Sequence, residues 1–279
     1  IFRAFLNPGD KIAIPNPGYP LYANGGALLN EFHPVILDLD CDSNFVPQIN
    51  QLQDTDFSGI YLNYPNNPTG AVVEFSDLKN IVNICNDKGS IIVYDNAYSE
   101  ITYNDYKAPS ILQHEEARQN SIEFHSLSKT FNMTGYRIGF AVGNKTLVDG
   151  LKKIKNQIDS GSPKFIQHAA KVALDSYVNG IPPKEISNNL KIYENRMNIL
   201  TDGLIKLGYD IKMPFGTFYL WMKIDEDCEN FAMRLLNNGV VVTPGSGFGT
   251  SGNKYVRFSI TLSDANLLKG LNKIPENTS

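Results

Sequence analysis

The sequence has 279 residues, of which 42% are hydrophobic and 19% charged, enough to bury a large core in one big domain or two. Its formal net charge is −4 without a basic block, so we expect no nucleic-acid partner and no binding to an anionic membrane. No apolar run is long enough to span a bilayer. Widely separated cysteines and histidines without metal-ligand spacing argue against a disulfide framework and a metal site, and favour a cytoplasmic location.

The first residues of the chain read as the end of a helix that runs into a turn. Apolar Ile1, Phe2, Phe5 and Leu6 fit one helical face, and the Asn-Pro-Gly-Asp sequence at 7–10 stops it. Because the chain begins inside an element and without Met, we expect it to lack an N-terminal segment.

Strands and a helix alternate through the first half of the chain. Apolar runs predict strands at residues 11–15, 33–39, 58–64 and 90–94. A helix is expected at residues 76–88, with Ser76 as its N-cap and Gly89 after its last turn. This alternation is typical of a mostly parallel sheet covered by helices, which binds ligands beyond the carboxyl ends of its strands.

Three motifs lie at the ends of these predicted strands. In NPGYPLY, residues 16–22, prolines and a glycine fix a turn that presents Tyr19. In YPNNPTG, residues 64–70, Asn67 lies in a rigid loop with amide donors. Asp95 follows an apolar strand, where its carboxylate needs a cationic partner. Each motif has an ordinary alternative: a core tyrosine, a plain turn, and an aspartate that caps a helix.

The most informative stretch is SIEFHSLSKTFNMTGYRIGFAVGN, residues 121–144. We expect strands at 121–125 and 138–142, joined by a polar turn that holds Ser126, Ser128, Lys129 and Arg137. A lysine in this position loses solvation, which lowers the pKa of its ammonium and frees the amine to form a Schiff base. The hydroxyls and the guanidinium suit a phosphate. Together these groups indicate pyridoxal phosphate (PLP), and the alternative is an ordinary surface lysine.

The second half of the chain predicts a smaller unit. Helices are expected at residues 145–158, 163–177 and 184–207, the last being long and amphipathic. Strands near 217–223 and 240–243, a helix at 228–238 and a strand at 255–260 follow. We therefore predict a large PLP-binding domain at residues 1–185, with its N-terminal part missing, and a small α+β domain at residues 186–279.

Arg257 is the notable residue of the small domain, because an arginine inside an apolar strand needs an anionic partner. A guanidinium that binds in a bidentate manner suits the α-carboxylate of an amino acid, whereas the alternative is a structural salt bridge. The glycine-rich segment at 244–249 follows a strand but lacks the other features of a nucleotide-binding loop.

In their order along the chain, these motifs resemble those of the class I/II aminotransferases of PLP fold type I. The string EFHSLSKTFNMTGYRIGFAVGN is similar to the branch that includes the bacterial LL-diaminopimelate aminotransferases. The resemblance extends from NPGYP to YVRFSIT, and implies an α/β fold with a mostly parallel sheet, flanking helices and a smaller C-terminal domain.

The resemblance also implies a role for each candidate residue. Lys129 would carry PLP and move a proton, Asp95 would pair with the ring nitrogen, and Tyr19 would stack on the ring. Asn67 and Tyr98 would reach the phenolic oxygen of the cofactor. The phosphate would be bound by Ser126, Ser128 and Arg137. The substrate carboxylate would be bound by Asn67 and Arg257.

The implied activity is ping-pong transfer of an amino group between an amino acid and a 2-oxo acid. LL-Diaminopimelate with 2-oxoglutarate, and hence lysine biosynthesis, is the first choice by resemblance. Aspartate, alanine and aromatic aminotransferases share the same motifs. The alternatives are another PLP chemistry on this fold, such as a β-lyase or decarboxylase, and a non-catalytic PLP-binding domain of a regulator.

The family also implies a homodimer. In the family, a segment before the position of Ile1 supplies a glycine-rich turn to the phosphate and an aromatic residue to the partner's site. We therefore expect residues 1–279 alone to bind PLP poorly.

Overall fold

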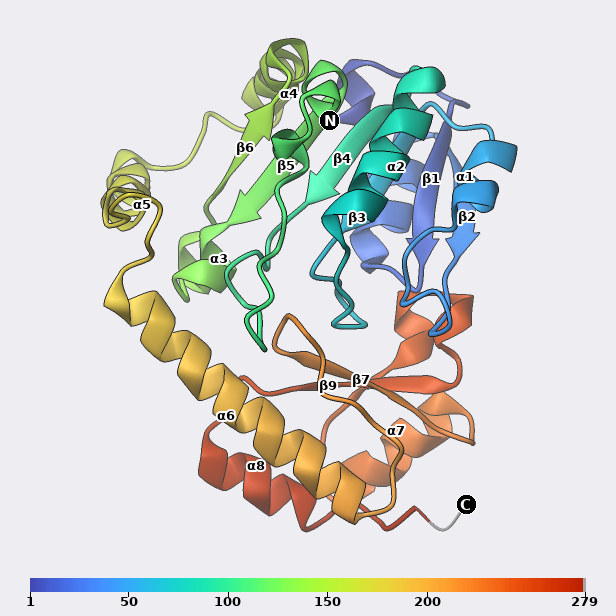
Figure 1. The fold of residues 1–279 in the computed structure, drawn as a ribbon, viewed down its shortest axis with the longest axis vertical. Helices are drawn as coiled ribbons and strands as arrows, with labels where there is room; N and C mark the ends of the chain where they lie inside the picture. Colours follow the sequence, from blue (N-terminus) through green and yellow to red (C-terminus); the bar gives the residue numbers. More distant parts are fainter. Residues whose placement is uncertain (278–279) are drawn as a thin grey trace.

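The computed structural model describes residues 1–277, and a six-stranded sheet forms its larger part (Figure 1). The strand order is β2-β1-β3-β4-β5-β6, in which only the β5–β6 pairing is antiparallel. The strands are β1 (Lys11–Asn16), β2 (His33–Asp38), β3 (Gly59–Asn63), β4 (Ile91–Asp95), β5 (Ser121–Ser126) and β6 (Gly139–Gly143). The mostly parallel α/β fold expected from the sequence is confirmed.

Helices and two apolar layers cover this sheet. Side chains that include Ile60, Leu62 and Tyr94 pack against α2, and Ile12 and Ile14 belong to the layer on the other face. The helices of this part are α1 (Ile49–Asp54), α2 (Phe75–Asp87), α3 (Leu127–Thr130), α4 (Lys145–Ile158) and α5 (Lys164–Asp175).

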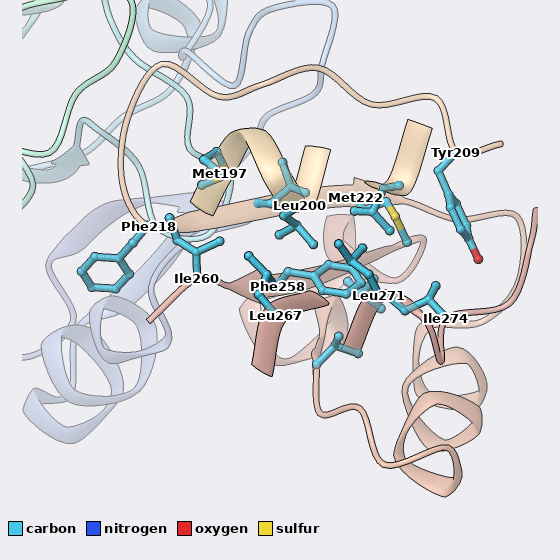
Figure 2. Packing of buried hydrophobic residues seen from close by; sticks show 14 of the residues in the cluster. Met197, Leu200, Tyr209, Phe218, Met222, Phe258, Ile260, Leu267, Leu271 and Ile274 are labelled. Carbon is cyan, nitrogen blue, oxygen red and sulfur yellow. The ribbon is translucent and has the colours of Figure 1, made fainter. Parts of the chain in front are cut away.

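The small domain follows the long helix α6 (Lys184–Lys206), which runs alongside it in Figure 1. Its three-stranded antiparallel sheet has the order β7-β9-β8. The core between this sheet and its helices includes Met197, Leu200, Phe258 and Leu271 (Figure 2). The remaining elements are β7 (Tyr219–Lys223), α7 (Cys228–Asn237), β8 (Thr243–Pro244), β9 (Tyr255–Ser259) and α8 (Asp264–Leu271).

Several predicted boundaries were wrong. Ser76 lies inside α2, whose N-cap position is held by Glu74. The expected strand at 240–243 is only the two-residue β8, because the Val240 N–H donates to the Leu235 carbonyl and closes the end of α7. The first residues form a 3₁₀ turn at Phe2–Ala4 instead of the end of an α-helix.

The loop between β4 and β5 joins the two parts of the molecule. Tyr98, Ile101 and Tyr103 belong to the same buried cluster as the small-domain core. The predicted division at residues 185 and 186 lies next to the start of α6 and stays a prediction.

The carboxyl ends of the parallel strands bring polar residues to one edge of the sheet. Asn16, Asn63, Asp95 and Ser126 end β1, β3, β4 and β5. The chain order reverses at β1, and a crevice at such a point is where open α/β sheets bind ligands. Within residues 1–277, no helix has the length and apolar composition needed to cross a membrane.

Candidate active site

A cavity of about 650 Å³ lies at this edge of the sheet, between the large sheet and the small domain. Every candidate residue named from the sequence lines it: Tyr19, Asn67, Asp95, Tyr98, Ser126, Ser128, Lys129, Arg137 and Arg257. The site therefore brings together residues far apart in the chain, since Tyr19 and Arg257 are separated by 238 positions.

Lys129 reaches the cavity from α3, directly after β5. Its Nζ lies 5.6 Å from the centre of the Tyr98 ring and 5.4 Å from that of the Phe218 ring. Burial lowers the pKa of the Lys129 ammonium, as do nearby arginine charges, and the Asp95 carboxylate opposes them. Lys129 is therefore easier to deprotonate than an ordinary surface lysine.

Asp95 presents a half-buried carboxylate to the same cavity. Its Oδ2 accepts a hydrogen bond from the Tyr22 hydroxyl at 2.6 Å, and its Oδ1 accepts one from the Ala97 N–H at 3.2 Å. Burial raises the pKa of Asp95. These two hydrogen bonds and the charges of His125 and Lys129 lower it, but the net effect is a raised pKa. Turns rather than a helix follow Asp95, so the helix-cap alternative does not hold.

Tyr22 is a site residue that sequence reasoning missed. It begins a π-helix, Tyr22–Ala27, and its ring stacks on Tyr61 with centroids 4.7 Å apart. Burial raises the pKa of Tyr22 well above its usual value, so its hydroxyl keeps its proton and donates to Asp95. A second tyrosine three positions after Tyr19 was the available signal, but the pattern gave no reason to prefer it.

Arg257 enters the cavity from β9 of the small domain and meets Asn67 of the large one. Its Nη1 donates to Asn67 Oδ1 at 2.7 Å, and its Nη2 donates to Thr243 Oγ1 at 3.4 Å. The guanidinium carbon lies 3.9 Å from the centre of the Tyr219 ring and 4.6 Å from that of Phe248. These contacts hold the guanidinium in one orientation.

Within the described residues, Arg257 nevertheless has no anionic partner. Among residues 1–277, no carboxylate forms an ion pair with it, and its buried Nε has no hydrogen-bond partner. Burial is the main cause that lowers the pKa of Arg257, as expected for a charge that lacks full compensation. The structural salt bridge considered from the sequence is therefore absent from the described residues.

Ser126, Ser128 and Arg137 line the same cavity as Lys129. Ser128 is buried, Ser126 is half-buried and Arg137 is exposed. Arg137 has a left-handed backbone, with φ of 53°, and its Nη1 donates to the Thr134 carbonyl at 3.1 Å. Hydroxyl groups and a guanidinium on one turn suit a dianionic phosphate.

Tyr19 and Tyr98 supply aromatic surface to the cavity. Tyr19 is 41% exposed and packs edge-on against Tyr22, so it is not the core tyrosine of the alternative interpretation. Tyr98 is buried, and packs edge-on against Phe218 and Tyr219. Tyr219 begins β7 and Phe218 directly precedes it; neither residue was selected from the sequence.

The residues present fit PLP. The cavity holds a lysine with a lowered pKa, a half-buried carboxylate with a raised pKa, hydroxyl and guanidinium groups that suit a phosphate, and exposed aromatic surface. A cationic ring nitrogen would compensate the Asp95 charge, because the hydrogen bonds and charges around Asp95 offset its desolvation only in part.

Comparison with known proteins identifies relatives over almost the whole chain. The family described as aminotransferase class I and II matches residues 1–274. LL-Diaminopimelate aminotransferase from Aquifex aeolicus is 42% identical, over 97% of this chain and 70% of its own length. LL-Diaminopimelate aminotransferase 2 from Trichormus variabilis is 36% identical, over 99% of this chain and 70% of its own length.

Solved structures give the same result. Apo-BacF from Bacillus subtilis superposes with a TM-score of 0.90 at 32% identity, covering 98% of this chain and 73% of that one. An aromatic aminotransferase from Pyrococcus horikoshii superposes with a TM-score of 0.91 at 28% identity, covering 98% and 74%.

Proposed function

Because this chain belongs to the class I and II aminotransferases, which use PLP to move an amino group between an amino acid and a 2-oxo acid, we propose a role for each residue of its cavity. Lys129 attaches the cofactor, Asp95 pairs with its ring nitrogen, and Tyr19 covers its ring. Ser126, Ser128 and Arg137 bind the phosphate. Asn67 and Tyr98 serve the phenolic oxygen, and Asn67 and Arg257 serve the substrate carboxylate.

When bound, PLP supplies an electron sink that stabilises negative charge at the substrate's α-carbon. The residues of the chain do the rest. Arg257 binds the α-carboxylate and orients the Cα–H bond toward Lys129. The neutral Lys129 Nζ accepts the proton from Cα and holds it for return. Asp95 stays anionic and keeps a proton on the ring nitrogen, with Tyr22 and Ala97 holding its oxygens in place.

The observation that carries this proposal is the Arg257 guanidinium, which lines the same cavity as Lys129 and has no carboxylate partner within residues 1–277. A carboxylate held there and an amine with a lowered pKa are the two groups that amino transfer from an α-amino acid requires.

We propose LL-diaminopimelate and 2-oxoglutarate as the substrates, which would place the enzyme in lysine biosynthesis. The support is that relatives 36–42% identical to this chain bear the name of that activity. The test is an assay of the PLP-loaded protein against a panel of amino donors that includes aspartate, alanine and aromatic amino acids. Another preferred donor would reject this choice but not the transaminase. Release of pyruvate and ammonia, or of CO₂, would instead indicate a β-lyase or a decarboxylase.

We also propose a homodimer, a cytoplasmic location and a division into residues 1–185 and 186–279. The exposed position of Arg137 and the open edge strand β6 are compatible with a second copy beside the site. Free Cys41, Cys85 and Cys228 suit a reducing compartment. Light scattering on the purified protein measures the first of these proposals directly.

A further inference from the structure

Glu123 is a fully buried carboxylate beside the active site that the proposed chemistry does not use. It lies in the middle of β5, and its relative exposure is 0%. A buried carboxylate costs several kcal/mol unless it is well paired. A carboxylate retained at this depth therefore needs an explanation.

The two oxygens of Glu123 hold both ends of one loop. Oε1 accepts a hydrogen bond from Asn96 Nδ2 at 2.9 Å, at the start of the loop that follows Asp95. Oε2 accepts one from Ser110 Oγ at 2.6 Å and one from the Ile111 N–H at 3.1 Å, at the end of the same loop. One carboxylate thus closes the base of the loop at residues 97–109.

This loop carries functional side chains and contacts the small domain. Tyr98 lines the active-site cavity, and Ile101 and Tyr103 pack in the small-domain core. Asp95 is the last residue of β4 and directly precedes Asn96. The hydrogen bond from Asn96 to Glu123 therefore also fixes the strand end that carries Asp95. The position of the loop and that of Asp95 therefore depend on Glu123.

His125 is the charge partner of Glu123 on the same strand. Its Nε2 lies 2.8 Å from Glu123 Oε1, and its ring stacks on Phe140 with centroids 4.8 Å apart. Burial acts to raise the pKa of Glu123, but hydrogen bonds from His125, Ser110 and Asn96, together with the His125 charge, lower it below its usual value. Glu123 is therefore ionised at neutral pH, and His125 donates to it.

We propose that Glu123 and His125 are positioning residues for amino transfer, which act as a charged clamp on the loop at 97–109. Glu123 does not line the active-site cavity, whereas His125 lies at its wall, directly before Ser126. The clamp's hydrogen bonds to the loop hold Tyr98 and Asp95 in place. Because His125 directly precedes Ser126, the clamp also holds the turn that carries Lys129. The inference rests on the proposed roles of Asp95, Tyr98 and Lys129.

The test compares variants of the PLP-loaded enzyme. Glu123→Gln keeps the shape but removes the charge and half of the acceptor capacity, and His125→Phe keeps the stack on Phe140 but removes the donor. Misplacement of reacting groups by about 1 Å costs on the order of 100-fold in rate. We therefore expect kcat to fall about 10-fold to 100-fold in both variants, with KM for the amino donor changed less than about threefold.

Rescue and coupling separate this role from general stabilisation. His125→Gln retains an N–H donor and should recover most of the kcat lost in His125→Phe. The double variant of Glu123→Gln with His125→Phe should lose no more than the worse single variant, because each removes the same clamp. His33→Phe, an exposed histidine at the other edge of the sheet, is the matched control and should match the wild type.

A readout on the cofactor-free protein completes the test. Thermal unfolding shows whether each variant is folded. Nitrogen NMR of the His125 ring should show a proton on Nε2 in the wild type and a changed ring signal in Glu123→Gln. The proposal is overturned if folded variants keep the wild-type kcat, if only KM changes, or if His125→Gln is no better than His125→Phe. An inactive wild type, or an active Lys129→Ala variant, would instead reject the proposed function, and the NMR result would still report on the clamp.

Discussion

The Tyr22 hydroxyl donates a hydrogen bond to Asp95 Oδ2 at 2.6 Å, which joins the π-helix Tyr22–Ala27 to the end of β4. Asp95 thereby has a fixed orientation, because its other oxygen accepts from the Ala97 N–H. A desolvated carboxylate that is held in place but not neutralised can accept a cation, and we propose that this cation is the ring nitrogen of PLP.

Removing this hydrogen bond should slow the enzyme. In Tyr22→Phe the ring still stacks on Tyr61, but Asp95 loses a donor that lowers its pKa, so the carboxyl becomes harder to ionise. A hydrogen bond to a charged group contributes about 1.5–3 kcal/mol, which corresponds to a loss in kcat of about 10-fold to 100-fold. Tyr61→Phe keeps the bond to Asp95 and should have a smaller effect. Equal kcat values for Tyr22→Phe and the wild type would show that Tyr22 only fills space.

Replacing Asp95 should stabilise the cofactor-free protein while removing activity. The folded-state pKa of Asp95 is raised above 3.8, so its contribution to stability is fully present below that value and is lost as pH rises through the folded pKa. At neutral pH the ionised carboxylate therefore lowers the free energy of unfolding. Asp95→Asn avoids this cost but cannot hold the proton on the ring nitrogen.

The measurement for Asp95 is denaturant unfolding of the cofactor-free protein between pH 4 and pH 8, together with kcat of the loaded enzyme. We expect the stability advantage of Asp95→Asn over the wild type to grow with pH, and kcat to fall on the order of 100-fold or more. Asp202→Asn, on the exposed surface of α6, should change neither quantity. A kcat near that of the wild type would mean that Asp95 has only a structural role.

Arg257 should determine the affinity for the substrate carboxylate. Arg257→Lys keeps the positive charge but loses the planar fork that contacts Asn67 and Thr243, so it cannot bind a carboxylate with two parallel hydrogen bonds. KM should rise by about 10-fold to 100-fold for both the amino donor and the 2-oxo acid. Arg234→Lys, in the exposed part of α7, is the control. Unchanged KM values for both substrates would reject this role.

The sequence predicted that the candidate residues would share one cavity, but it did not predict the side chains that surround them. Asn67, Asp95 and Lys129 each follow an apolar run, and parallel topology forces strand ends to one edge, so their convergence followed from local pattern. Arg257 was selected because a charge in an apolar strand is conspicuous. The side chains that hold these groups, Tyr22 above all, read as ordinary core residues until the fold brings them together.

Features of the fold that depend on tertiary contacts were likewise not predicted from local sequence patterns. Glu123 stands in a strand that looks amphipathic, and only its contacts to Asn96, Ser110 and Ile111 show that it is buried and paired. Boundaries were less predictable than elements, because they depend on capping bonds such as that from Val240 N–H to the Leu235 carbonyl. Helix α8 and the short α1 were not predicted, because their apolar residues are too few to give a clear period.

The attachment of the cofactor to Lys129 can be measured directly. The protein is reconstituted with PLP, reduced with borohydride so that the C=N bond to the lysine becomes a stable amine, digested, and sequenced by mass spectrometry. We expect a pyridoxyl label on Lys129 alone, and no label after reduction of Lys129→Ala. A stoichiometric label on any other lysine, with Lys129 unmodified, would contradict it.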